Sequence, residues 1–81
     1  MSTPDGDVVH EIAGEIRRYI RSHPRAADSV DGIHRWWLVP ALRDEAREAV
    51  EIALQQLVDE GVLRRVPLED GQVIYSAAPV H

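Results

Sequence analysis

A chain of 81 residues is long enough for one small domain, which buries only about 60% of the surface that its unfolded form exposes. Apolar residues make up 44% of the sequence, a fraction typical of a folded globular protein. Because the chain has no cysteine, it can form no disulfide, thiolate nucleophile or thiolate metal site. The net charge of −5 disfavours a protein that binds phosphates over a broad basic surface.

The composition also bears on location. The first seven residues are acidic and polar, the opposite of a signal peptide. No apolar run approaches the roughly 20 residues that a membrane span needs. All nine cationic residues are arginine, which indicates a bacterial genome rich in G and C. We therefore expect a cytoplasmic bacterial protein that does not bind membranes.

A first helix is predicted over residues 8–22, with Asp7 as its N-cap, because apolar residues recur there at helical spacing. Its acidic residues lie early and its arginines late, which complements the helix dipole. Pro24 disfavours helical geometry at His23, so the helix should end near Ser22. The arginines form the only basic run on a helix. They either balance the dipole or contact nucleic acid or an acidic partner, and they are Arg17, Arg18 and Arg21, with Arg25 just beyond.

A short link over residues 25–27, with room for one bridge of strand pairing, leads to a second helix over residues 29–38. Asp28 or Ser29 is its expected N-cap, and Pro40 ends it or opens the next link.

The second helix carries two adjacent tryptophans that cannot share one core position. Val30, Ile33 and Trp37 fall on one face of a helix, so Trp37 is the expected core residue. Trp36 is rotated off that face and should be partly exposed. It either borders the core or anchors a protein interface, where tryptophan is enriched.

A third helix is predicted over residues 45–60, starting at Asp44 and stopped by Gly61 in a left-handed C-cap position. The periodicity then changes to alternation, which predicts strands over residues 62–67 and 72–77.

Asp70-Gly71 between the two strands is a strong signal for a two-residue hairpin turn. This turn predicts a register that puts four apolar side chains on one half-buried face, and Pro67 suits an edge strand because it lacks a backbone donor. The predicted pairs are Leu68 with Val73, Val66 with Tyr75 and Arg64 with Ala77.

Three helices followed by a hairpin resemble the winged-helix family over residues 8 to 77. The most specific part is Val50-x-x-x-Leu54-x-x-Leu57-x-x-x-Gly61-Val62-Leu63, which is similar to a pattern of many bacterial winged helices. The resemblance implies a mostly α fold with a C-terminal β-hairpin, that is, a three-helix winged-helix domain. We expect a flexible arm over residues 1–6, the domain over 7–77 and a tail over 78–81.

In that family the third helix usually enters the major groove of DNA and the tip of the hairpin touches its backbone, but winged helices also serve as protein-binding modules. Fold alone therefore does not fix the function. Here the presumed reading helix has the wrong charge, since six acids and two arginines over residues 43–60 leave −4. The hairpin tip adds Glu69 and Asp70.

One interpretation is that the acidic face has no partner and simply faces solvent. Beyond that interpretation, the sequence predicts two functions from different classes. The first is a non-enzymatic module that binds a second copy of itself or a basic protein, with the candidate interface Trp36, Glu48, Glu51 and Gln55. The alternative is a DNA-binding transcriptional regulator, with the candidate contacts Arg43, Arg47, Arg64 and Arg65.

Catalysis is not expected. The four histidines have no metal-ligand spacing, and the glycines form neither a phosphate-binding loop nor a dinucleotide fingerprint. The serines lack the context of a catalytic nucleophile. We therefore expect no metal, no cofactor and no small-molecule ligand.

Overall fold

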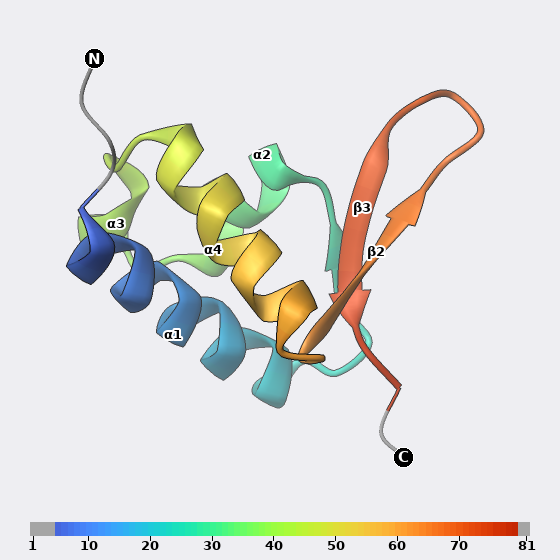
Figure 1. Cartoon of the computed structure of the whole chain (residues 1–81), viewed down its shortest axis with the longest axis horizontal. Coiled ribbons are helices and arrows are strands. Elements are labelled where there is room, and N and C mark those ends of the chain that lie inside the picture. The colour runs from blue at the N-terminus through green and yellow to red at the C-terminus, as the bar shows by residue number, and fades with distance from the viewer. Residues whose placement is uncertain (1–4, 80–81) are drawn as a thin grey trace.

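The computed structural model describes residues 5–79, and it is mostly helical with a small three-stranded sheet (Figure 1). Its main helical segments and C-terminal hairpin confirm the predicted fold class, and their order is compatible with a winged helix. Residues 1–4 of the arm expected over 1–6, and the last two residues of the expected tail, lie outside the described part. In chain order the elements are α1 (Gly6–Ser22), β1 (Ala27–Asp28), α2 (Val30–Gly32), the π-helical η1 (Ile33–Trp37), α3 (Pro40–Arg43), α4 (Arg47–Asp59), β2 (Leu63–Pro67) and β3 (Val73–Ala77).

Helix α1 starts earlier than predicted. Asp5, not Asp7, is the N-cap, because an Asp5 carboxylate oxygen accepts a hydrogen bond from the Asp7 backbone N–H at 2.8 Å. Two residues that we expected in the arm therefore belong to the cap and first turn of the helix. The predicted end at Ser22 is confirmed, and the His23 N–H closes the last turn on the Tyr19 carbonyl.

Ser29 caps the second helical segment, since its hydroxyl accepts a hydrogen bond from the Gly32 N–H at 3.2 Å. The predicted helix phase is confirmed, because Trp37 is 5% exposed and Trp36 is 65% exposed. The Trp37 ring stacks on Tyr19 with ring centroids 4.6 Å apart, so η1 is fastened to α1 by aromatic packing.

The start of the third predicted helix was wrong. Pro40 opens the separate short helix α3, whose Leu42 is buried, and Asp44 ends that helix as its C-cap. Helix α4 then begins at Arg47, and its N-cap Ala46 offers no side-chain hydrogen bond. The burial of Leu42 accounts for the extra turn, because it anchors this segment in the core before α4 can start.

The predicted stop at Gly61 is confirmed. Gly61 has a φ of +78° and donates a hydrogen bond to the Val58 carbonyl at 3.0 Å, while the Val62 N–H donates to the Leu57 carbonyl at 2.9 Å. This pair of hydrogen bonds is a Schellman motif, which satisfies carbonyls that the end of α4 would otherwise leave unpaired.

The hairpin forms where predicted, but its register differs by one residue. Arg65 lies opposite Tyr75, and Val66 lies opposite Ile74. The loop has three residues, not two, because the Leu68 N–H donates to the Gln72 carbonyl at 2.7 Å and Gly71 has a φ of +89°. A type I turn followed by a glycine bulge explains this geometry.

The register decides which side chains of the hairpin reach the core. Tyr75 is buried as predicted, and Leu63 shares its face. Val66 and Leu68 do not join them, because the one-residue shift turns them to the outer face of the sheet. The strand order β1-β3-β2 confirms that β2, which carries Pro67, is an edge strand.

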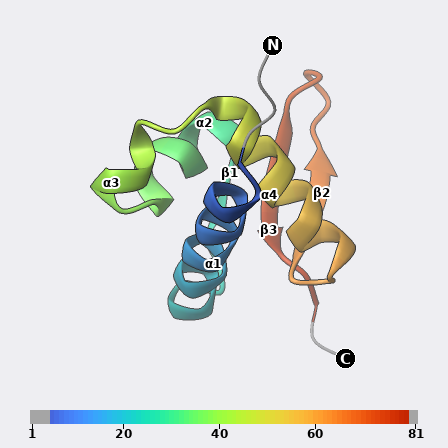
Figure 2. The same ribbon diagram turned by 60° about the vertical axis from the view of Figure 1, so that its left-hand side comes forward.

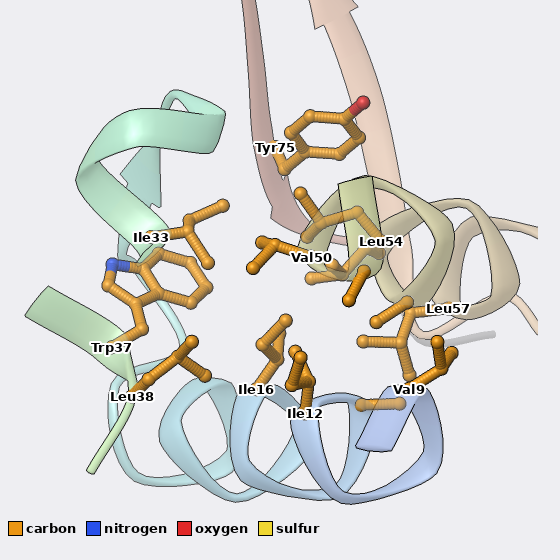
Figure 3. Close-up of a cluster of buried hydrophobic side chains, with 14 of the residues drawn as sticks. Val9, Ile12, Ile16, Ile33, Trp37, Leu38, Val50, Leu54, Leu57 and Tyr75 are labelled. Atoms are coloured by element: carbon orange, nitrogen blue, oxygen red, sulfur yellow. The ribbon is translucent and has the colours of Figure 1, made fainter. Parts of the chain in front are cut away.

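The core lies between α1, η1, α4 and the sheet (Figure 3). Helices α1 and α4 make the most extensive contact between helices. The large side chains that are fully buried are Ile12, Ile16, Ile33, Val50, Leu54, Leu57 and Leu63. Residues 5–79 contain no helix that is both long and apolar enough to cross a membrane.

Trp37→Ala should destabilise the fold by about 3–5 kcal/mol, because it deletes a large buried aromatic side chain. Against a total of about 5–8 kcal/mol for so small a domain, this loss should leave the variant marginally folded. Trp36→Ala should cost clearly less, because that ring is mostly in solvent. Thermal melts of the two variants test this, and a larger loss for Trp36→Ala would contradict it.

Two Gly→Ala substitutions should change stability in opposite directions. Gly61→Ala should destabilise by about 1 kcal/mol, since an L side chain is strained at positive φ. Gly14→Ala should stabilise the monomer by about 1 kcal/mol, because a Cβ there meets nothing within 4 Å and alanine is the better helix former. Urea unfolding in dilute solution measures both changes in the free energy of unfolding. Changes of the same sign would contradict the different roles given to Gly61 and Gly14.

Candidate functional site

The solvent side of α4 is an acidic stripe, which we define as Glu48, Glu51 and Gln55. All three side chains are exposed and follow one another at helical spacing. The opposite side of α4 is buried against α1 and the sheet. Asp59 extends the stripe by one turn and accepts a hydrogen bond from Gln55 at 3.0 Å. The structure therefore brings together three of the four residues predicted for a protein interface.

Arg47 is the one arginine of α4, and it is held by carboxylates. Its guanidinium forms an ion pair with Asp31 of α2, and its Nε lies 3.7 Å from a carboxylate oxygen of Glu51. The Arg47 side chain is still 55% exposed. Its charge is nevertheless offset on both sides, which leaves the surface acidic where α4 begins.

Asp31 is the residue of this site that sequence analysis missed. It lies 16 residues before Arg47, and the two meet only because α2 packs on the first turns of α4. Together they line a cleft of about 340 Å³ between α2, α4 and the start of β3. The other residues of this cleft are Ser29, Val30, Gln72 and Val73.

The remaining arginines proposed for DNA contact do not gather around this cleft. Arg43 ends α3 and donates a hydrogen bond to the Leu38 carbonyl at 3.1 Å. Arg64 and Arg65 follow the other end of α4, about 20 Å from Arg47 by the rise of 13 helical residues. The structure therefore divides the four candidate arginines between two ends of α4.

The tip of the hairpin projects beyond the helices (Figure 1) and adds more negative charge. Glu69 and Asp70 are both exposed, and Asp70 accepts a hydrogen bond from the Gln72 N–H at 3.0 Å. Leu68, at the end of β2, is 40% exposed. Acidic groups thus occupy both the α4 surface and the tip.

Trp36 belongs to a second surface. It lies on η1, which packs on α1, whereas α4 packs on α1, β2 and α2. Val39, just beyond η1, is 41% exposed. Trp36 and the acidic stripe are therefore carried by different helices, and the predicted interface splits into two parts.

Two histidines of the described part have distinctive surroundings. His23 stacks on Tyr19, and the Nε2 atom of His34 is buried without a hydrogen-bond partner. Residues 5–79 contain no group of three His, Asp or Glu side chains that could hold a metal ion.

No family model, curated protein or solved structure matches this chain.

If the carboxylates around Arg47 repel phosphates, removing them should strengthen weak DNA binding. In water, one unit charge about 8 Å from a phosphate contributes roughly 0.5 kcal/mol. The double substitution Asp31→Asn and Glu51→Gln should therefore raise the affinity for duplex DNA about fivefold at low salt. Fluorescence anisotropy of a labelled duplex measures this change.

The matched control is Asp59→Asn with Glu60→Gln, which removes the same charge at the other end of α4. It should change the affinity for DNA less than the first pair. Equal effects of the two double variants would mean that only net charge determines the affinity for DNA and that the carboxylates around Arg47 have no particular role.

Proposed function

We propose that this chain is a winged-helix module that acts through protein contacts, and that the acidic stripe of α4 binds a basic partner. The order of the elements and the pairing of β1 with the hairpin support the winged-helix assignment. The engagement of Arg47 by Asp31 and Glu51 carries the functional part. A helix that reads DNA needs its basic side chains for contacts with phosphates and bases. The single arginine of α4 is paired instead with two carboxylates.

The charge of the surrounding surface supports the same conclusion. A phosphate contact normally uses an arginine, a lysine or a backbone donor, and acidic groups in the same place repel the DNA backbone. Glu48, Glu69 and Asp70 are exposed and have no ion-pair partner among residues 5–79. A protein with a basic face would be attracted to this surface and steered toward it.

Trp36 is the second contact that we assign to protein binding. Tryptophan is enriched among the residues that dominate binding energy, and an indole that is 65% exposed has most of its apolar surface left to bury. Because it lies apart from the acidic stripe, it serves either a large partner or a second, separate contact. We propose no catalytic, metal or cofactor site for this module.

A pull-down from a lysate of the source organism, followed by mass spectrometry, tests the proposal. The wild-type chain should enrich a basic protein in a salt-sensitive way, and Glu48→Arg should reduce the yield at least several-fold because it reverses a charge in the stripe. Gln56→Arg is the matched control, since it adds the same side chain to an exposed position of α4 outside the stripe. It should retain the partner.

The competing function is transcriptional regulation through DNA, which the element order alone favours. It predicts binding to duplex DNA whose affinity falls steeply as salt rises. Micromolar or tighter binding of the wild-type chain in a gel-shift titration, together with no enriched protein, would replace our proposal by this one.

A further inference from the structure

The outer face of α1 carries an ordered set of residues that the core does not use. Five positions separated alternately by four and three residues form one stripe, the α1 seam, which consists of Asp7, Glu11, Gly14, Arg18 and Arg21. All five are exposed, and the buried residues of α1 lie on its opposite side. Figure 1 shows α1 at the edge of the molecule, and Figure 2 shows α3 and α4 on either side of it.

Gly14 lies at the centre of the seam, and neither packing nor backbone conformation within the monomer requires a glycine there. A Cβ at this position would meet nothing within 4 Å, and the backbone does not have the positive φ that requires glycine. Glycine is nevertheless among the poorest residues for a helix interior. What glycine does provide is room for another backbone to come close.

The charges on either side of Gly14 are ordered. Asp7 and Glu11 precede it, whereas Arg18 and Arg21 follow it. A second α1 laid antiparallel across Gly14 would place Glu11 opposite Arg18 of the second copy, and Asp7 opposite its Arg21. A two-fold axis repeats both pairs, so every charge of the seam meets its opposite. A parallel arrangement would instead face like charges.

The neighbouring surface offers apolar area to the same contact. A groove of about 390 Å³ runs between α1 and α3, and Gly14 lies in its wall. Val39, which is 41% exposed, and the exposed Ala41 also line it. Arg18 is within reach of a partner, because its side chain is 77% exposed and its only ion pair among residues 5–79 is a 3.4 Å contact with Glu15.

We propose that the α1 seam is the interface of a symmetric homodimer, in which two copies of α1 pack antiparallel across Gly14. The occupant of this face is a second copy of the same chain, since the seam is complementary to itself. This interface involves α1 and the α3 groove beside it, and it does not depend on the acidic stripe of α4 or on its partner.

Analytical ultracentrifugation over a range of concentrations tests the proposal. The purified chain should change from its 9.1 kDa monomer to a dimer as concentration rises, and added salt should weaken the dimer. Glu11→Arg and Arg18→Glu should each abolish dimerisation, because each makes two like-charged contacts across the axis. Glu48→Arg and Arg64→Glu reverse the same charges outside the seam and should leave the dimer intact.

Mixing the two seam variants gives the sharpest result. In a heterodimer of Glu11→Arg with Arg18→Glu, both contacts again join opposite charges, so an equimolar mixture should dimerise although each variant alone does not. A parallel contact would also join opposite charges in this mixture, but it would face like charges in the wild-type chain. A wild type that dimerises, together with the rescue, therefore identifies the antiparallel contact. A mixture that stays monomeric overturns the proposal.

Gly14→Leu separates association from folding. It should abolish the dimer by blocking close approach, while the thermal midpoint of the dilute monomer stays equal or rises. The proposal is overturned if the wild-type chain remains monomeric up to about 1 mM, the weak end of specific affinities. It is also overturned if a dimer forms that none of the α1 substitutions affects, since another face would then hold it. Either result leaves the binding of a basic partner by α4 open to its own test.

Discussion

The packing of α1 on α4 is the constraint on which the rest of the structure depends. In a chain of 81 residues this contact buries most of the large aliphatic side chains, with Ile12 and Ile16 meeting Leu54 and Leu57 in one cluster (Figure 3). The remaining elements attach to it, η1 through the stacking of Trp37 on Tyr19 and the hairpin through Tyr75 and Leu63. Because the inner sides of both helices are taken by the core, the candidates for function on these two helices lie on their outer sides.

Local signals predicted the elements well and their boundaries less well. The end of α1 before Pro24 and the end of α4 at Gly61 each depend on the backbone of one or two residues, so the sequence indicates them directly. The start of α4 depends instead on the burial of Leu42, which is a tertiary contact. The predicted hairpin register was wrong for another reason, since Asp-Gly is compatible with both a two-residue turn and a three-residue turn with a bulge.

In the candidate site, too, local features could be predicted from the sequence and tertiary contacts could not. Helix periodicity was enough to place Glu48, Glu51 and Gln55 on one exposed stripe and to separate Trp36 from Trp37. It could not reveal that Asp31 reaches Arg47, because that contact joins helices whose mutual position depends on the whole fold. The pairing matters most for function, since an arginine read from the sequence as a possible DNA contact is held by two carboxylates in the folded chain.

Charge is distributed over the two main helices in two different patterns. On α4 the acids outnumber the single arginine, so that surface is complementary to something basic and not to itself. On the α1 seam the two acids precede Gly14 and the two arginines follow it, so the seam is complementary to its own copy in reverse direction. Helices α1 and α4 contact each other through their buried sides. Substitutions on the outer face of either helix therefore leave this core contact unchanged. If both proposals hold, the two surfaces act at the same time, one holding copies of the chain together and the other recruiting a partner.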